Sequence, residues 1–383
     1  MTIHLDFSDR LFKNDPWPIY QWHMANSPAV WAPGMQCHTI FGYTNVRTAL
    51  TSPNFIAFNP FRRTRLAIGP SMLDNDGRSH DRYRRAVAPY FKPATIADYQ
   101  YSIVEPIVVQ ALSELIEQGD PHWLTKLSER VPVEVAATII GLPIEEAQYI
   151  HRIMRPLVDF IDHGSATFET VTQRRDMLRE YLQDMSDDVV GFHGFIESLC
   201  STGALAKNEA INSALLLLVA ATETTSAAFV NFTTRIAAEP DIFQHWTASP
   251  HKITLAVAET LRHEPPLHMT VRYARSDIKL AGTEMPRGTA VQVCLASANR
   301  DPSVFPDPDV WQMARRPGQA MTFGAGVHHC LGSSLARMEL TVFAYELLRR
   351  FASLQLESPG HPTTQGRTFR RVPDAVIAYS LRQ

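Results

Sequence analysis

The sequence has few cysteines, and none of them forms a closely spaced pair. Four cysteines, Cys37, Cys200, Cys294 and Cys330, are spread over 383 residues. Disulfide frameworks use cysteines in even sets within short chains, so this scarcity argues against a disulfide-stabilised fold. It leaves room for a single cysteine with a chemical role.

Excess charge of one sign and long hydrophobic runs are also missing. The net charge is −3, which gives no sign of a nucleic-acid-binding protein. The longest apolar run extends only from Ala214 to Ala221, whereas a bilayer helix needs about 20 residues. The start, "MTIHLDFSDRLFKND", has neither a basic stretch nor an apolar core, so we expect no signal peptide. We therefore expect a cytoplasmic protein that binds neither nucleic acid nor membrane.

No repeat, Gly/Ser linker or long charge run divides the chain, which favours one domain over residues 1–383 and, as a default, a monomer. Hydrophobic periodicity predicts helices over 78–91, 96–118, 124–140, 145–161, 166–186, 209–237, 252–263 and 331–350. Short strand patterns are "VWAP", "HTIFG", "AVQVCLA" and "AVIAYSL". The predicted fold class is mainly α with small β-sheets (α+β).

The most informative segment of the sequence is "FGAGVHHCLGSSLAR", residues 323–337. Gly324 and Gly326 permit backbone shapes closed to other residues. Leu331 and Leu335 begin a helical pattern, so Cys330 lies where a loop becomes a helix. Unpaired N–H groups and the positive end of the helix dipole lie there, and both stabilise a thiolate.

The loop alone allows four interpretations. A cysteine hydrolase would use a neighbouring histidine as base. A zinc site would need more ligands than His328 and His329, which are adjacent and poorly placed to share one metal. A haem-thiolate site needs one cysteine and close backbone approach. The last interpretation is a buried cysteine with a structural role only.

The segment "FGAGVHHCLG" resembles the haem-binding signature of the cytochrome P450 family, F-x-x-G-x-x-x-C-x-G, and matches it at every fixed position. The resemblance implies a P450 fold with a long central helix over haem b. It implies that Cys330 is the axial thiolate ligand and that Phe323 packs beside the sulfur. It further implies that Leu331 and Gly332 direct amides toward the sulfur, and that His328 reaches a haem propionate.

Glu259 and Arg262 are three residues apart on a predicted helix, so they can pair on one face. An exposed pair of this kind would contribute little. The pair resembles the family's E-x-x-R motif, and Arg315 in "VWQMAR" matches the arginine that completes its triad. The resemblance implies a structural network that holds the cysteine loop.

The segment "LLLLVAATETTSAAF", residues 215–229, is apolar on nearly all sides and predicts a buried helix. Ordinary core packing explains Thr225, but a buried carboxylate such as Glu223 is rare without a purpose. The stretch resembles the family's oxygen-activation motif, (A/G)-G-x-(D/E)-T, with Ala221 in the usual glycine position. The resemblance implies that Glu223 relays protons and that Thr224 steadies the activated oxygen.

His80 and Arg84 lie four residues apart, and two cationic groups on one helix face suggest an anion between them. A solvated surface pair is the alternative. The resemblance implies that both residues, together with Arg272 in "VRYA", bind haem propionates. Ala320 replaces a histidine found in many relatives, which removes one expected propionate contact.

Family analogy also suggests the lining of the substrate pocket. Phe58 and Phe61 would suit an aromatic or polycyclic substrate, and three nearby arginines, Arg62, Arg63 and Arg65, would suit a carboxylate or remain solvated. The expected pocket residues are Phe58, Phe61, Leu217, Leu267, His268 and Met269.

The predicted function is that of a haem-thiolate monooxygenase that activates O2 and oxidises a small organic substrate in secondary metabolism. No flavin or iron–sulfur segment is present, so electrons would come from a ferredoxin and its reductase, or from a flavodoxin. Arg82, Arg85 and Arg337 would form a basic patch for that partner, or else a plain solvated face. The alternatives are a peroxide-driven peroxygenase, which would not need Glu223 and Thr224, and a non-catalytic haem sensor.

Overall fold

The structure is a computed structural model. It describes residues 4–188, 194–201, 203–239, 243, 252–313, 315, 318–357, 364–373 and 375–382. The chain forms two compact units. The sheet unit comprises Met1–Ala57, Ala227–Ser333 and Ala344–Gln383, and the helical unit comprises Phe58–Ser226 and Ser334–Phe343.

A five-stranded sheet organises the sheet unit, in the order β1-β2-β7-β4-β3. Only β2 and β7 pair in parallel, and the other neighbours are antiparallel. The other described strands form two antiparallel two-stranded sheets, β5 with β6 and β8 with β9. The strands are β1 (Ala29–Ala32), β2 (Cys37–Ile40), β3 (Phe55–Ile56), β4 (Met269–Ala274), β5 (Ile278–Leu280), β6 (Thr283–Met285), β7 (Ala290–Cys294), β8 (Phe351–Leu356) and β9 (Ile377–Leu381).

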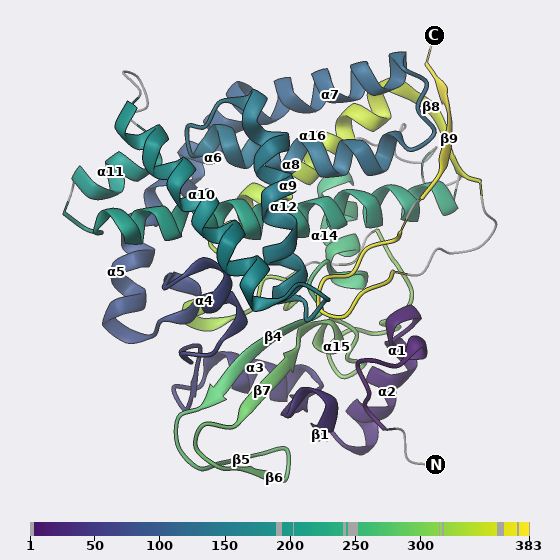
Figure 1. Cartoon of the computed structure of the whole chain (residues 1–383). Coiled ribbons are helices and arrows are strands. Elements are labelled where there is room, and N and C mark those ends of the chain that lie inside the picture. Colours follow the sequence, from purple (N-terminus) through teal and green to yellow (C-terminus); the bar gives the residue numbers. More distant parts are fainter. Residues whose placement is uncertain are drawn as a thin grey trace. The chain divides into compact units, whose positions relative to one another are not determined.

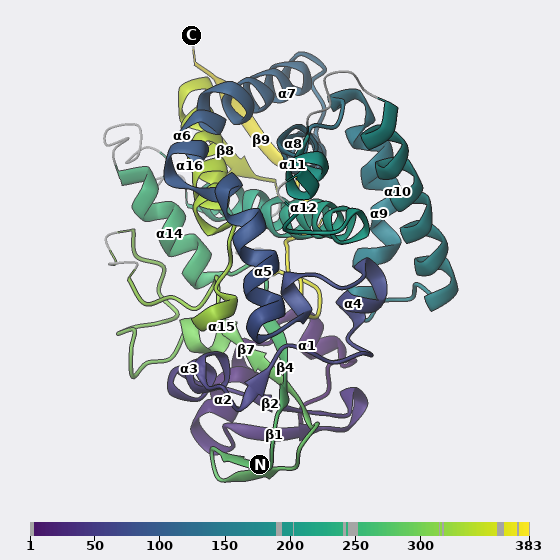
Figure 2. The same ribbon diagram turned by 90° about the vertical axis from the view of Figure 1, so that its left-hand side faces the viewer.

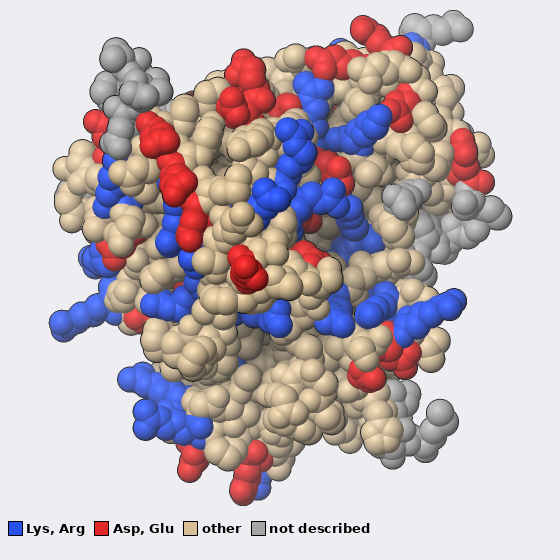
Figure 3. Space-filling model, viewed as in Figure 1, with Lys and Arg blue, Asp and Glu red and all other residues tan. Residues whose placement is uncertain are grey.

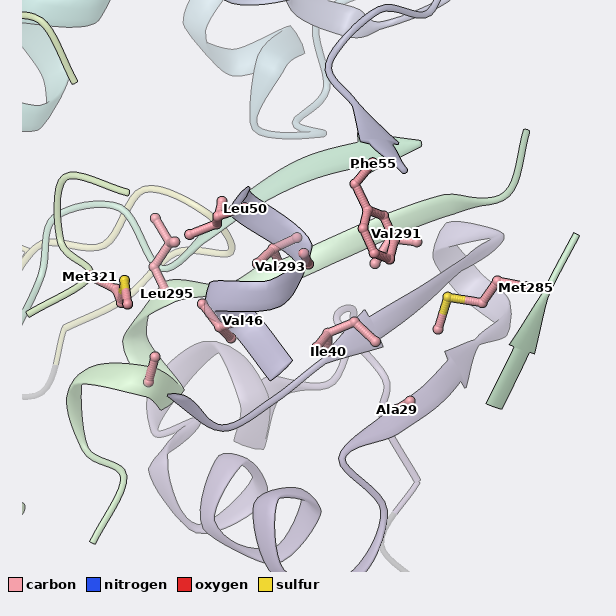
Figure 4. Packing of buried hydrophobic residues seen from close by; sticks show 12 residues of the cluster. Ala29, Ile40, Val46, Leu50, Phe55, Met285, Val291, Val293, Leu295 and Met321 are labelled. Atoms are coloured by element: carbon pink, nitrogen blue, oxygen red, sulfur yellow. The ribbon is translucent and has the colours of Figure 1, made fainter. Parts of the chain in front are cut away.

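One face of this sheet packs on the helix α3 (Tyr43–Thr51), as Figure 4 shows. Ile40 of β2 and Val293 of β7 meet Val46 and Leu50 of that helix. The other described helices of the unit are α1 (Arg10–Asn14), α2 (Trp17–Asn26), α14 (Ile253–His263) and α15 (Leu295–Asn299).

The helical unit is built from packed helices, and α9 and α10 run side by side in both Figure 1 and Figure 2. The short helix α4 packs against both of them. The helices are α4 (Arg63–Ile68), α5 (Gly77–Val87), α6 (Pro93–Tyr99), α7 (Glu105–Glu117), α8 (Trp123–Ile139), α9 (Ala147–Ile161), α10 (Phe168–Asp188) and α11 (Phe195–Ser201). Two further helices, α12 (Lys207–Ala238) and α16 (Ser333–Arg350), contribute residues to both units.

Helix α12 is the one helix of the described chain that is long and apolar enough to cross a membrane. However, 72% of its most apolar window is buried inside the protein. That burial is typical of a core helix.

The predicted fold class is confirmed: the chain is mostly helical with small sheets. Each predicted long helix is present, and the four strand patterns correspond to β1, β2, β7 and β9. The predicted helix 96–118 is in fact interrupted. A π-helical turn over Gln100–Val104 separates α6 from α7, and Pro106 lies just inside the start of α7, where its missing N–H is harmless.

Candidate functional site

The loop that carries Cys330 closes on itself within the sheet unit. The Cys330 N–H donates to the carbonyl oxygen of Phe323 at 2.9 Å, and the His329 N–H donates to that of Gly326 at 3.0 Å. Gly326 has a φ of +72°, and a Cβ there would lie 2.7 Å from the carbonyl oxygen of Leu50. A side chain at this position would therefore force the loop away from α3.

Cys330 differs from the other three cysteines in its exposure. It is exposed, whereas Cys37 and Cys294 are buried, and burial raises the pKa of each of those two thiols to about 12. Gly332 caps α16, so Cys330 lies just before the N-terminus of that helix, as predicted. In the described part of the chain, no group of three or more His, Cys, Asp or Glu side chains is placed to hold a metal ion. The zinc interpretation therefore lacks a ligand set.

The pairing predicted for Glu259 and Arg262 is present. Two nitrogens of Arg262 donate to the two oxygens of Glu259, at 2.8 and 2.7 Å. Arg315 Nε and the Gln312 N–H also donate to Glu259 Oε1, at 3.1 and 2.9 Å. Arg262 reaches the carbonyl oxygen of Asn299 at 2.9 Å. Both members of the pair are at most 2% exposed, so this network is a buried structural tie rather than a surface salt bridge.

One strip of α12 is left partly open although most of the helix is buried. Leu217, Ala221 and Thr224 are half-buried and Ala220 is exposed, while Leu218, Thr222 and Thr225 are buried. The open positions follow the helical spacing of three, four and seven residues, so they lie on one face. The Thr224 hydroxyl donates to the carbonyl oxygen of Ala220 at 2.8 Å. The strip is thus lined by one leucine, two alanines and one hydroxyl.

Glu223 is half-buried and faces a neighbouring helix of the same unit. Its Oε1 lies 4.0 Å from Nε2 of His151 on α9. His151 was not identified from the sequence, because it is far from Glu223 along the chain and no local spacing connects them. The carboxylate therefore has a basic neighbour that only the fold brings close.

The residues expected at haem propionates lie on α5, on β4 and in the cysteine loop. His80, on α5, is buried, and its Nδ1 lies 3.1 Å from Asp81. Arg84 is half-buried one turn further along α5. Arg272, on β4, is buried, and its Nη1 donates to the carbonyl oxygen of Val271 at 2.8 Å. His328 and Phe323 are half-buried in the cysteine loop.

The pocket predictions divide into two groups. Phe58 and Phe61 are exposed and Leu267 is half-buried. His268 and Met269 are buried, with at most 2% of either residue exposed. His268 Nδ1 lies 3.1 Å from the Tyr20 hydroxyl, and Met269 belongs to the same apolar cluster as Tyr20.

Of the three arginines predicted to form a basic patch, Arg82 is paired within the protein. Its guanidinium donates to both oxygens of Glu209, at 2.7 and 2.5 Å, and this bond holds the pKa of Glu209 at about 2. Arg85 and Arg337 are exposed. In Figure 3, Lys and Arg side chains and Asp and Glu side chains are both spread over the visible face.

Known proteins resemble this chain in sequence and in structure. A family model described as Cytochrome P450 matches residues 253–373. The biotin biosynthesis cytochrome P450 of Bacillus subtilis is 30% identical over 307 residues, which is 74% of this chain and 74% of that protein. Cytochrome P450 monooxygenase PikC of Streptomyces venezuelae is 28% identical over 91% of this chain and 87% of its own length.

The fold agrees with these matches. The structure of P450 RauA, complexed with a biosynthetic intermediate of aurachin RE, has a TM-score of 0.85 and 26% identity. The match covers 97% of this chain and 98% of that one. The chain therefore belongs to the cytochrome P450 family, whose members are monooxygenases that hold haem through a cysteine thiolate and activate O2.

Proposed function

We propose that this protein is a P450 monooxygenase in which Cys330 is the thiolate ligand of the haem iron. The observation that carries the proposal is the exposed thiol of Cys330, held in a loop that closes on itself just before α16. Haem supplies four nitrogen ligands of its own, so one protein thiolate is enough to fix it. The donor set of this loop therefore fits haem.

A second observation supports the fit. The partly open strip at Leu217, Ala220, Ala221 and Thr224 leaves room beside a core helix for a flat, apolar group. We assign the propionate contacts to His80, Arg84, Arg272 and His328, because charge-assisted bonds to carboxylates are strong. Phe323 and Gly332 would shape the surroundings of the sulfur. Glu259, Arg262 and Arg315 would hold the loop in place.

When bound, the haem iron supplies the site at which O2 is reduced, a reaction that consumes two electrons and two protons. We assign the protons to α12. Glu223 Oε would take up a proton from the solvent side, and the Thr224 hydroxyl would leave the Ala220 carbonyl to pass it on. Ala221 would keep this part of the strip narrow.

The electron donor and the substrate are proposals of the same kind. We propose a ferredoxin with its reductase, or a flavodoxin, as donor, with Arg85 and Arg337 among its contacts. The exposed rings of Phe58 and Phe61 favour an aromatic or polycyclic substrate. One relative is a biotin biosynthesis cytochrome P450, and the structure of another holds a biosynthetic intermediate. Both support a biosynthetic role for a single cytoplasmic catalytic domain.

The test of the thiolate is spectroscopic. Reduced protein with carbon monoxide should show the strongly red-shifted Soret band of thiolate ligation, and Cys330→Ser should lose it. Cys200→Ser is the matched control and should keep the band. A Cys330→Ser protein that keeps the band would disprove the assignment.

The proton assignment is tested by coupling, which is product formed per NADPH consumed. Thr224→Ala should bind haem and substrate normally but release more of the electrons as hydrogen peroxide. General acid–base groups contribute about 10² to 10⁴ in rate. Thr225→Ala, whose hydroxyl is buried off the open strip, is the control. Equal coupling in wild type and Thr224→Ala would contradict the assignment.

A further inference from the structure

Three polar side chains form a row in the interior of the sheet unit. The hydroxyl group of Tyr20, on α2, lies 3.1 Å from Nδ1 of His268. Nε2 of the same imidazole lies 3.7 Å from Oε1 of Glu264. Neither Tyr20 nor His268 has any exposed surface, and Tyr20 packs within an apolar cluster. The phenol is thus the end of the row that is shielded from water.

The carboxylate at the other end of the row fixes the direction in which a proton can move. Burial raises the pKa of Glu264, but the neighbouring His268 and Arg300 outweigh it and hold that pKa at about 2. An ionised carboxylate beside Nε2 favours the imidazole tautomer that carries its hydrogen there, which leaves Nδ1 as an acceptor for the Tyr20 hydroxyl. Burial lowers the pKa of His268 to about 4. The ring is therefore neutral near pH 7 and free to accept a proton.

The phenol itself is built to keep its proton unless it is oxidised. Burial raises the pKa of Tyr20 well above its usual value. Loss of an electron turns a phenol into a strong acid, so an oxidised Tyr20 would release this proton to the nearest base. Cys294 lies in the same cluster, but burial raises the pKa of its thiol to about 12, so it stays protonated and is a weak acceptor. His268 is the base in the right place.

The next aromatic ring is a poor site for positive charge. The ring centroids of Trp17 and Tyr20 are 5.6 Å apart. The guanidinium group of Arg300 lies over the Trp17 ring, 3.4 Å from its centroid. The π electrons of a ring attract such a cation, so removal of one of those electrons would place two positive charges together. Oxidation is therefore favoured at Tyr20, whose proton can leave, over Trp17.

We propose that Tyr20 is a redox-active tyrosine that gives one electron to the haem site when hydrogen peroxide accumulates there, with His268 holding the phenolic proton. The proposal rests on the proposed function, because uncoupled O2 reduction supplies the peroxide. Arg272, which we assign to a haem propionate, follows His268 by four residues, or about 13 Å of extended chain. Electrons tunnel through protein over such distances.

The electrons and protons of this step balance. Reduction of one hydrogen peroxide to two waters consumes two electrons and two protons. Tyr20 supplies one electron, the external electron donor supplies the other, and both protons come from solvent. The phenolic proton moves to Nδ1 of His268, which leaves a neutral tyrosyl radical and an imidazolium beside the Glu264 carboxylate. A later electron from the same donor and the proton on His268 restore the phenol. The oxidising equivalent is thereby held on a side chain that solvent does not reach.

The experiment mixes the full-length ferric haem protein with hydrogen peroxide, without substrate, and freezes it rapidly for electron paramagnetic resonance. We expect a tyrosyl radical, identified by a narrower spectrum when the protein contains ring-deuterated tyrosine. Tyr20→Phe should lose this signal, whereas Tyr101→Phe, the same change at a tyrosine that is 70% exposed, should keep it. His268→Gln should lower the yield of radical at least about tenfold, because a positioned base contributes about 10² to 10⁴ in rate.

A spectroscopic signature separates this role from a structural one and needs no variant. In wild type containing isotope-labelled histidine, pulsed spectra should show coupling of the radical to a histidine nitrogen, because Nδ1 lies 3.1 Å from the phenolic oxygen. A radical without that coupling, a tryptophan radical, or a tyrosyl signal that persists in Tyr20→Phe would each overturn the proposal. Equal radical yields in wild type and His268→Gln would do so too.

The carbon monoxide spectrum of the same samples tests the proposed function separately. A protein that shows the thiolate band but forms no tyrosyl radical would refute the redox role of Tyr20 and leave the proposed function intact. A protein without the band would refute the thiolate assignment, and the redox role with it.

Discussion

Arginine clusters in the two units are held in opposite ways. In the sheet unit, Arg262 and Arg315 share the carboxylate of Glu259, so the buried charges are paired within the protein. In the helical unit, Arg179 is held only by neutral oxygens of Asn212 and Ile68. The first arrangement pairs the charges within the protein, and the second leaves a half-buried guanidinium without a bound carboxylate among the described residues.

The difference indicates which arginines the fold depends on. Removing one member of a complete buried ion pair strands a charge, which is strongly destabilising. Arg179 is half-buried and donates hydrogen bonds to neutral oxygens, so its removal strands no buried carboxylate. Charge balance therefore separates two arginine clusters that the sequence alone presents as equivalent.

The largest effect should follow from breaking the complete pair. Glu259→Gln leaves Arg262 and Arg315 buried without a counter-charge, so we expect a loss of about 3–5 kcal/mol in the free energy of unfolding. We also expect poor haem retention. Urea unfolding and the haem content of the purified protein measure both quantities. Glu284→Gln, the same change at an exposed position of β6, is the control. A stable, haem-replete Glu259→Gln protein would contradict the structural role.

We expect an intermediate effect on stability at Glu339. This carboxyl group is buried in the helical unit, and no described cation acts on it. Burial raises the pKa of Glu339 from 4.5 to about 8. The folded protein then binds more protons than the unfolded chain between these values, so stability is present at low pH and is lost as pH rises through 8. Glu339→Gln should therefore be more stable than wild type at pH 9, by about 2 kcal/mol. At pH 5 the two should be similar.

The sheet unit should respond to pH in the other direction. Burial lowers the pKa of His268 to about 4. Burial raises the pKa of Glu264, but the neighbouring His268 and Arg300 outweigh it and hold that pKa at about 2. Both groups favour the unfolded state as pH falls, below about 6.5 for the histidine and below about 4.5 for the carboxyl group. The free energy of unfolding of Glu339→Gln, measured from pH 4 to 9, should therefore still fall at acidic pH. If it also falls at alkaline pH as in wild type, Glu339 is not the cause of the alkaline loss of stability.

The smallest effect should be on the stability of the Arg179 variant. Arg179→Gln strands no carboxylate, and a glutamine amide can still reach Asn212. We expect a change within about 1 kcal/mol, compared with several for Arg262→Gln. Thermal unfolding of the two variants in parallel tests this contrast. Equal losses would mean that Arg179 belongs to the fold, and the distinction between the two clusters would disappear.

Much of the fold was predictable because its long helices carry strong periodicity. Residues 207–238 and 333–350 are helical as their apolar patterns indicate. Strand β4 was missed because the polar Thr270 and Arg272 interrupt its apolar alternation, and its partners β7 and β3 are distant in sequence. Short helices such as α4 were missed because one or two turns give too little pattern to detect.

The candidate site was predictable only where its residues lie close together in the sequence. Cys330 and the Glu259–Arg262 pair each lie within a short motif. The contact of His268 with Tyr20 could not be predicted, because Tyr20 lies near the other end of the chain. The contacts of Arg179 with Ile68 and Asn212 were equally invisible, since they join three separate segments. Tertiary packing, rather than residue type, decides whether such a side chain is structural or open to a ligand.

The close contact between Gly326 and Leu50 has a practical consequence for engineering. A library that varied the cysteine loop would find Gly326 nearly irreplaceable, because any side chain there strikes the α3 backbone. Val327, next to it, is 66% exposed and should accept almost any residue. Tuning of the loop's surface, for example to accept a different electron donor, can therefore begin at Val327. A second change that frees position 326 would have to move the Leu50 carbonyl first.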